Sequence, residues 1–412
     1  MIPTIMSLFD SRNLLEDSYY KKIEKGDIMC VDENDILISF LLPQDPAIVG
    51  KFIRIRDKDK DIYFSTAFLR LKARKCPQIL YYCLKSLFYH DMVSIARIRK
   101  GYTGYATLSK DDLKDMRFSK KIIDTIFDNQ ERISDLIANK EREIDSLNDS
   151  ILTAQEIIDS VFKREFEINT MKLYEIDCSK KQTISFNSYS DKNINCRLSY
   201  RWNKAVEIQN ELTREVGCCQ PLGLHILDTQ NGWSPDCSED SGDYQVLGLD
   251  AINKTGALSF DNPKYSSEYK KDFEKYVISN GNFFVSRGNT TDLVSLASIA
   301  FIDDEVPTTI YPDLMIKITF DSNINTPYMA YAINSFIGRL YFKYASKGKN
   351  QTMVKVSPRE LSDFMVPIPD IKTQEKIVCD IQAEIRKQDN IKEKIFQLRK
   401  QIDEMIIKTI KQ

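Results

Sequence analysis

Two loops of this chain combine basic side chains with aromatic or amide side chains, a mixture suited to binding nucleic acid. One loop runs from Ser94 to Tyr105 and contains two glycines, and the other runs from Lys343 to Thr352. Lys and Arg bind phosphate oxygens, while Asn and Gln can form two hydrogen bonds with the edge of adenine. The candidate DNA contacts are Arg97, Arg99, Lys100, Tyr102 and Tyr105 in the first loop, and Lys347, Lys349, Asn350 and Gln351 in the second.

Arg287 and Asn289 are further candidates, because they stand where an expected strand, Phe283–Ser286, leads into a turn. An ordinary solvated basic turn has a similar composition, so that interpretation stays open for both loops. The formal net charge of the chain is −2, whereas nucleic-acid-binding domains are often basic. Carboxylates gather elsewhere, at Glu141–Asp145 and Asp236–Asp243, so separate basic surfaces are compatible with this charge.

No group of residues has the spacing of a catalytic or metal centre. Asn262-Pro263-Lys264-Tyr265 matches the Asn-Pro-Pro-aromatic motif of amino-methyltransferases only in part, because the second proline and a glycine-rich cofactor loop are missing. Only two histidines occur, and the nine cysteines include no CxxC pair. A Walker-type phosphate loop is also missing. We therefore predict no catalytic residue, no metal and no cofactor.

Length and composition indicate a two-domain cytoplasmic protein. A chain of 412 residues with 42% hydrophobic residues can build two cores. No apolar run approaches the roughly 18 residues that would cross a bilayer, and the N-terminus is unlike a signal peptide. The lack of such a run also predicts no membrane partner. The cysteines are scattered rather than arranged as a disulfide framework, so we expect reduced thiols.

The two basic loops occupy equivalent places in an internal repeat. Matching segments recur in the same order, with Ser39 corresponding to Ser286 at an offset of 247 residues (286 − 39) and Ser109 to Ser357 at 248 (357 − 109). The matched segments are 35–40 with 282–287, 79–86 with 327–335, and 108–113 with 356–361. Such a pattern predicts two copies of one mixed α/β domain, each followed by a long helix.

Apolar residues repeat every 3.5 residues in both expected helices, which is typical of a coiled coil. The second helix contains neither Gly nor Pro after Pro369. Polar residues such as Lys140 and Gln388 interrupt the apolar seams, either to fix register or because a wet position tolerates them. The predicted interface residues are Ile137, Ile144, Leu147, Ile151 and Ile158 in the first helix, and Ile391, Ile395, Leu398 and Ile402 in the second.

With these features the chain resembles the specificity subunit of Type I restriction–modification enzymes. The most specific match is Val366-Pro367-Ile368-Pro369, followed by Gln374 and an Ile-rich helix. Trp202 resembles the opening of a recognition domain in that family. The resemblance implies a non-catalytic subunit that binds a bipartite sequence in double-stranded DNA and docks methyltransferase (modification) subunits. A translocating restriction subunit is a further partner that it implies.

The expected fold class is α+β, with two mixed α/β target-recognition domains separated by a long antiparallel two-helix coiled coil. The expected ranges are 1–121 and 169–370 for the two recognition domains, and 122–168 and 371–412 for the spacer helices. The first domain has no counterpart of Met171–Leu247, so we interpret it as truncated at its N-terminal side. A natural truncation, a start site placed too late and a split domain completed by another chain all stay open.

Two other functions fit parts of the sequence. One is the specificity component of a Type IIB-like restriction enzyme, which would keep the DNA-binding role. The other is a coiled-coil scaffold whose globular ends bind protein. A scaffold would explain the slightly acidic total charge, but it would leave the matched basic loops without a function.

Overall fold

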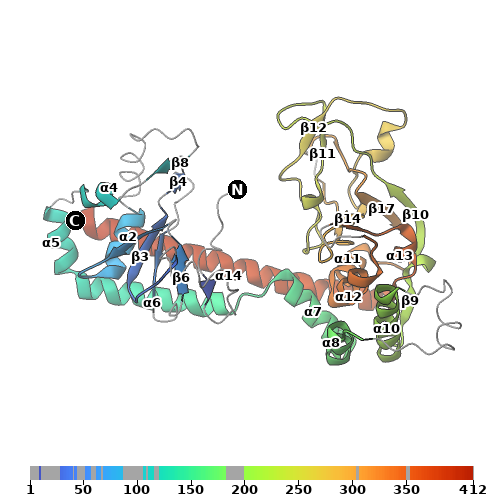
Figure 1. Ribbon diagram of the computed structural model, residues 1–412, viewed down its shortest axis with the longest axis horizontal. Helices are drawn as coiled ribbons and strands as arrows, with labels where there is room; N and C mark the ends of the chain where they lie inside the picture. The colour runs from blue at the N-terminus through green and yellow to red at the C-terminus, as the bar shows by residue number, and fades with distance from the viewer. Residues whose placement is uncertain are drawn as a thin grey trace. The chain divides into compact units, whose positions relative to one another are not determined.

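The computed structural model describes residues 9–10, 28–39, 41–43, 52–56, 62–65, 68–86, 105–107, 110–115, 120–181, 199–302, 306–348 and 353–411. The chain divides into two compact units, each of mixed helices and sheets (Figure 1). Unit 1 contains Met1–Ile151 and Asn390–Gln412, and unit 2 contains Leu152–Asp389. None of the helices among these residues is both long enough and apolar enough to span a membrane.

The core of unit 2 is a four-stranded antiparallel sheet in the order β10-β17-β13-β15. Alternate residues of its central strand enter two apolar clusters, because side chains along a strand point to opposite faces. Phe283 and Val285 pack with the helices on one face, and Phe284 packs in a second cluster on the other. The strands are β10 (Ile226–Asn231), β13 (Phe283–Ser286), β15 (Ala297–Ile299) and β17 (Met315–Phe320).

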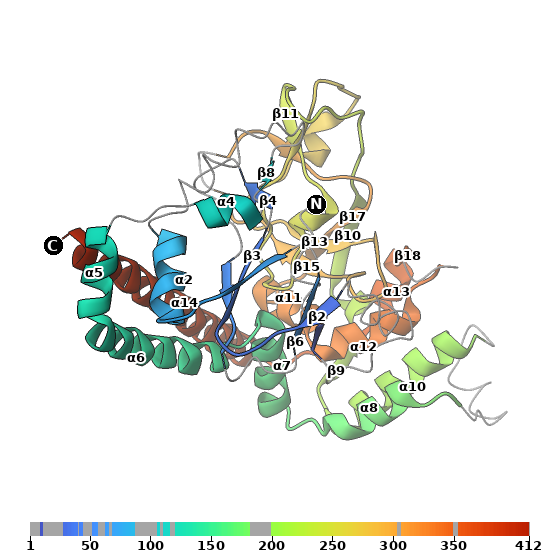
Figure 2. The same ribbon diagram turned by 60° about the vertical axis from the view of Figure 1, so that its left-hand side comes forward.

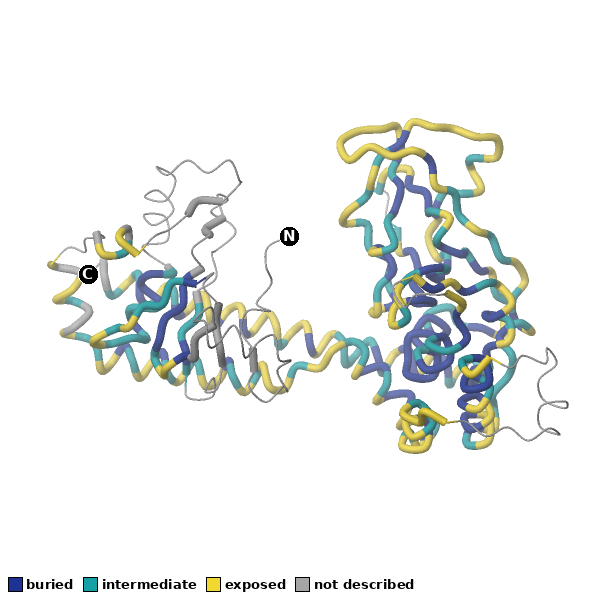
Figure 3. The backbone as a smooth tube through the Cα atoms, viewed as in Figure 1, coloured by how far each residue is buried: buried dark blue, intermediate teal, exposed yellow. Residues whose placement is uncertain are grey.

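Helices pack against this sheet and form much of the main core of unit 2, where Figure 3 shows buried coils. Their starts follow from local sequence, since Ser199, Asn325 and Ser335 accept backbone hydrogen bonds as N-caps of α10, α11 and α12. The helices are α7 (Ala154–Glu165), α8 (Thr170–Cys178), α10 (Tyr200–Glu215), α11 (Thr326–Asn334), α12 (Phe336–Ala345) and α13 (Pro358–Ser362).

Three smaller sheets and three short 3-10 helices complete the described part of unit 2. One sheet has three strands in the order β12-β11-β16, and the others are the pairs β14-β18 and β19-β9. The strands are β9 (Cys219–Pro221), β11 (Tyr244–Val246), β12 (Lys264–Ser266), β14 (Gly288–Asn289), β16 (Thr309–Ile310), β18 (Val354–Lys355) and β19 (Met365–Pro367). The 3-10 helices are η2 (Leu222–Leu224), η3 (Leu249–Ala251) and η4 (Phe273–Tyr276).

Unit 1 is built around a smaller antiparallel sheet in the order β5-β3-β7, with β3 in the centre. The buried residues Ile36, Leu37 and Ile38 form the middle of β3. The elements before the helices are β1 (Phe9–Asp10), β2 (Ile28–Cys30), β3 (Asp35–Ser39), β4 (Leu41–Pro43), β5 (Phe52–Arg54), β6 (Ile62–Ser65), β7 (Phe68–Lys72), α2 (Pro77–Ser86), β8 (Tyr105–Thr107) and α4 (Lys110–Asp115).

The internal repeat of the sequence reappears in strand register. Ser39 pairs with Phe68 in unit 1, and Ser286 pairs with Met315 in unit 2, so both partners are displaced by 247 residues (286 − 39 and 315 − 68). The β4-β8 pair corresponds to β14-β18 in the same way. Leu41 pairs with Thr107 and Gly288 with Lys355, at offsets of 247 and 248 (288 − 41 and 355 − 107). We call β2 to α4 the first copy and η4 to α13 the second copy.

The first long helix differs from the prediction. The single helix expected over 122–168 is three helices, α5 (Lys120–Asp128), α6 (Gln130–Asp149) and α7. Side chains end and restart the helix locally, because Ser150 Oγ donates to the carbonyl of Leu147 and Thr153 forms a capping box with Glu156. The apolar period continues through these residues, so it could not show the interruption.

The second long helix is α14 (Ile371–Lys411), which contributes residues to both units. In unit 1 its C-terminal half runs antiparallel to α6, and both views show the two side by side (Figures 1 and 2). Lys140 Nζ donates to Gln401 Oε1 at 2.5 Å, and Lys394 pairs with Glu143 at 2.7 Å. In unit 2, Arg164 on α7 pairs with Asp380 at 2.6 Å.

The predicted seam residues occupy the inside of these helix pairs. Ile137, Ile144, Ile395, Leu398 and Ile402 are buried in one cluster of unit 1, and Leu147, Ile151 and Ile391 pack against that cluster. Ile158 lies instead in the main core of unit 2, because α7 packs into the globular domain. Buried Ile406 also belongs to the cluster of unit 1 and was missing from the predicted set.

Candidate nucleic-acid interface

The β14-β18 ladder brings together residues that the sequence placed at two separate candidate sites. Gly288 pairs with Lys355 across the ladder, and an isolated bridge joins Lys355 to Lys347 on its other side. The Lys347 and Lys355 backbones exchange hydrogen bonds of 2.8 and 2.7 Å, and Val356 N donates to the carbonyl of Arg287. We call the residues 287–289, Lys347 and 354–356 the basic ladder.

Register decides which side chains share a face of the basic ladder. Lys347 and Lys355 stand directly opposite each other, so their side chains lie on one face. Both residues are exposed. Asn289 stands opposite Val354, which is fully buried, so Asn289 belongs to the other face. The predicted contacts Asn289 and Lys347 therefore lie close in the backbone but do not form a single side-chain surface.

Glycines permit the close approach of these strands. At Gly288 a Cβ atom would lie 3.4 Å from Cγ of Lys355 and 3.3 Å from Leu314, so the stem of Lys355 passes over the glycine. At Gly348 a Cβ would lie only 2.7 Å from the carbonyl oxygen of Met353. A side chain at position 348 would therefore push the ladder apart.

Lys347 is not a free cation. Its Nζ lies 2.5 Å from Oε1 of Glu360, whose side chain is completely buried. Burial would raise the pKa of Glu360, but the hydrogen bonds from Lys347 and Ser357 outweigh burial and hold the pKa below its usual value. Leaving a buried carboxylate without its cation costs on the order of 3 kcal/mol, whereas an exposed ion pair contributes about 1 kcal/mol or less. The Lys347 ammonium thus gains more free energy from its ion pair with Glu360 than it would gain from an exposed phosphate.

Lys355 is a basic residue of this site that the sequence-based prediction missed. A signal was present, because the sequence from Ser322 to Arg359 contains basic residues and no Asp or Glu. The first copy has a matching stretch without carboxylates from Met92 to Lys110. The basic residues are Arg339, Lys343, Lys347, Lys349, Lys355 and Arg359 in the second copy, and Arg97, Arg99, Lys100 and Lys110 in the first.

Several predicted contacts lie outside the described residues. They are Lys349, Asn350 and Gln351 in the second copy, and Arg97, Arg99, Lys100 and Tyr102 in the first. Tyr105 lies in β8, where its backbone pairs with Pro43. Arg287 is half-buried, and its backbone N–H donates to the carbonyl of Leu314 at 2.7 Å.

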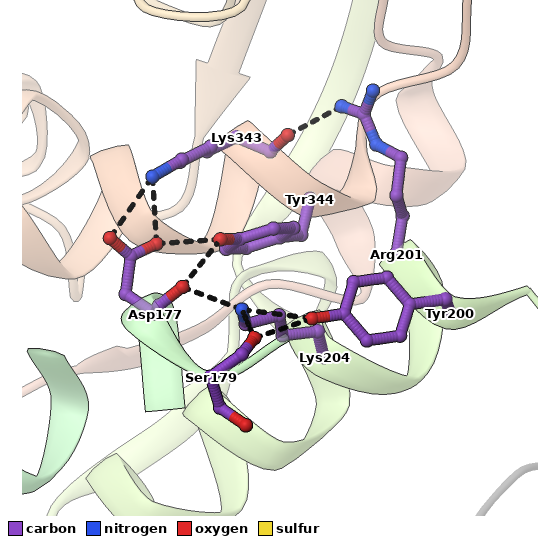
Figure 4. Close-up of polar contacts among 7 residues, drawn as sticks. All are labelled: Asp177, Ser179, Tyr200, Arg201, Lys204, Lys343 and Tyr344. Atoms are coloured by element: carbon purple, nitrogen blue, oxygen red, sulfur yellow. Dashed lines mark hydrogen bonds and ion pairs between the residues drawn. The ribbon is translucent and has the colours of Figure 1, made fainter. Parts of the chain in front are cut away.

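A polar network holds the end of α12, from which the second basic loop begins (Figure 4). Asp177 of α8 accepts hydrogen bonds from Lys343 Nζ at 2.8 Å and from the Tyr344 hydroxyl at 2.7 Å. Burial alone would raise the pKa of Asp177, but these two donors keep the pKa below its usual value. Arg201 of α10 donates to the carbonyl of Lys343 at 2.5 Å and to Ser346 at 3.2 Å.

Lys204 lies behind this network and is 3% exposed. Its ammonium donates to the carbonyls of Asp177 and Ser179 at 2.6 and 2.7 Å and lies 3.2 Å from the Tyr200 hydroxyl. The ammonium also lies 4.8 Å from the centre of the Tyr344 ring, a cation–π distance. The buried charge therefore caps the C-terminal end of α8 and joins it to α10 and α12. We call Asp177, Arg201, Lys204, Lys343 and Tyr344 the brace.

The described residues contain no group of three or more His, Cys, Asp and Glu side chains arranged to hold a metal ion. His225 is buried and lies between Asp321 at 3.0 Å and Gln220 at 3.2 Å. These contacts join the β9 and β10 region to the end of β17. These contacts give His225 a structural role within unit 2.

No protein family and no curated protein matches the sequence. Solved structures that match this one include three that each align with 92% of this chain. One is described as the structural basis of complex assembly and conformational transition of the type I R-M system (TM-score 0.43, 11% identity, 82% of that chain). Another is the HsdS subunit from Thermoanaerobacter tengcongensis (0.35, 12%, 81%). The third is a Type-I restriction-modification system S subunit from M. genitalium (0.39, 14%, 83%). The chain is similar in structure to specificity subunits of Type I restriction–modification systems.

Proposed function

We propose that this chain is the DNA sequence-recognition subunit of a Type I restriction–modification complex. The observation that carries the proposal is the repeat, in which both copies have the same strand register and each contains a basic stretch without carboxylates before its final helix. A single chain that reads a bipartite sequence needs two such modules. A scaffold that binds protein does not require matched basic stretches.

In this proposal each copy, with its basic loop, contacts one half of the DNA target. The lysines and arginines bind phosphates and fix the position of the domain, which makes binding dependent on salt. Arg287, Asn289, Asn350 and Gln351 of the second copy are the proposed donors to base edges. In the first copy, Arg97, Arg99, Lys100, Tyr102 and Tyr105 are the proposed contacts.

The helices that follow the two copies form the proposed spacer and docking surface. Their antiparallel contacts support this role, because a repeat of domain and helix can place its two domains at opposite ends only when the helices run antiparallel. The methyltransferase subunits would bind along α6 and α14, and a restriction subunit would join through them. The chain itself is proposed to be non-catalytic.

Methylation assays test the proposal directly. The purified chain, a candidate Type I methyltransferase subunit from the same genome and their complex are each incubated with genomic DNA and S-adenosylmethionine, and methylated sites are mapped. We expect methylation at a bipartite sequence only when both proteins are present. Methylation by the chain alone, or an identical map without it, would refute the proposal. A complex that binds other proteins but no DNA would favour the scaffold.

A further inference from the structure

We infer that Lys355 is the residue of the basic ladder that binds a DNA phosphate, and that Lys347 positions the ladder through its ion pair with Glu360. The inference rests on the proposed function and assigns separate roles to two lysines that face the same way. It replaces the prediction that Lys347 contacts phosphate. The ligand is the phosphodiester backbone of double-stranded DNA.

Lys355 has the properties of a phosphate ligand. It occupies the middle segment of the ladder, with Gly288 on one side and Lys347 on the other. Its backbone is fixed by hydrogen bonds to Lys347, and its neighbours Val354 and Val356 are buried. Among the described residues, no hydrogen-bond or ion-pair partner contacts its ammonium. A rigid backbone thus presents an unneutralised charge to solvent.

Lys347 has the properties of a positioning residue. Its ammonium reaches a carboxylate that water does not reach, and the second oxygen of this carboxylate accepts the N–H of Ser357 at 3.1 Å. Ser357 caps α13, which begins three residues after Lys355. The ion pair therefore connects the start of the basic loop to the turn that ends it. A phosphate near the ladder would therefore bind the ammonium of Lys355 in preference to that of Lys347, whose charge is already neutralised by Glu360.

Salt dependence separates the two roles. The complex with the methyltransferase is titrated with a mixed-sequence DNA duplex at several salt concentrations, because phosphate contacts are independent of sequence. For Lys355→Gln we expect the slope of log K against log salt to fall by about 0.9, with about eightfold weaker binding near 0.1 M salt. For Lys347→Gln we expect an unchanged slope and a lower melting temperature of the chain. Lys271→Gln, which changes an exposed lysine outside the ladder, should alter neither quantity.

A double variant protects the test against misfolding. Lys347→Gln leaves Glu360 as an unpaired buried charge, whereas Lys347→Gln with Glu360→Gln removes both charges and should recover most of the lost melting temperature. The slope of the double variant should equal that of the wild type. An unchanged slope in Lys355→Gln, or a reduced slope in the double variant, would overturn the inference. If the wild-type complex binds no duplex at all, the proposed function fails instead.

Discussion

The two copies of the repeat share a core but differ in what supports it. In both, a central buried strand pairs with the same neighbour in the same register. The second copy follows a segment containing α8, α10 and β10, whereas the residues that the structure describes before the first copy contain only the short strand β1. In unit 2 this segment extends the sheet by β10 beside β17 and supplies three residues of the brace, Asp177, Arg201 and Lys204.

The comparison teaches that the strand–helix unit and the support of its basic loop are separable. A loop that contacts DNA loses conformational entropy on binding, so fixing its start in advance increases affinity. The brace fixes the start of the second loop through three helices. Under the proposed function, the brace therefore makes the second copy the better preorganised reader of the two.

The largest expected effect is in the methylation map of a strain that carries this subunit as its only specificity protein. We expect one well-defined half-site, read by the second copy, and one half-site with relaxed base preference. Exchanging the order of the copies within the chain should exchange the order of the two half-sites. Two equally defined half-sites would show that the segment before the second copy does not govern specificity.

Removing the brace should make the second copy resemble the first. Lys204→Ala removes the three hydrogen bonds of a buried ammonium, while the Tyr344 and Tyr200 hydroxyls still donate to the carbonyls of Asp177 and Ser179, so we expect unit 2 to lose about 2 kcal/mol of stability. Lys180→Ala, an exposed change beside α8, is the matched control and should cost less than about 0.5 kcal/mol. Urea unfolding measures both values. Equal costs would mean that the brace does not stabilise this copy.

The helices that follow the copies also differ, and Gln388 explains one part of this difference. α14 is continuous, whereas the helical stretch after the first copy is interrupted at 129 and at 150–153. Gln388 is 6% exposed in the seam, and its Oε1 accepts the N–H of Leu152 at 3.0 Å. The buried side-chain amide of Gln388 thus accepts the hydrogen bond of the Leu152 N–H, which has no helical acceptor because the helix is interrupted there.

Gln388→Leu should destabilise the backbone conformation at 150–153, where the helix is interrupted. The lost hydrogen bond costs about 1–2 kcal/mol and the added apolar burial offsets part of it, so we expect a net loss near 1 kcal/mol. Hydrogen exchange of the Leu152 amide should become faster, because its acceptor is removed. Gln397→Leu on the exposed face of α14 is the control. Unchanged exchange at Leu152 would show that Gln388 does not hold this backbone group.

Much of the fold could be predicted from spacing, because the repeat and the heptads are periodic over many residues. The offset that linked Ser39 to Ser286 is also the offset of their strand partners. The interruption at 150–153 could not be predicted, since a capping box and one distant glutamine produce it without changing the apolar period. Glu360 lies 13 residues after Lys347 (360 − 347), and composition alone does not show that a buried carboxylate neutralises that lysine.

The smallest expected effect concerns the pH dependence of the brace. The folded pKa of Asp177 is held below its usual value, so its ionised form stabilises the fold above the unfolded pKa of about 3.9. That contribution is lost as pH falls through the folded pKa. Asp177→Asn keeps the hydrogen bond from Tyr344 but loses the ion pair with Lys343, at a cost of about 1 kcal/mol at neutral pH.

Urea unfolding of wild type and Asp177→Asn across a pH series tests this sign. The difference in unfolding free energy should be constant above about pH 5 and should shrink as pH falls below about 4. Asp380→Asn changes a more exposed ion pair with Arg164 and should give a smaller difference at every pH. A difference that grows on acidification would mean that the fold raises the pKa of Asp177. In that case the brace would hold its loop through uncharged contacts alone.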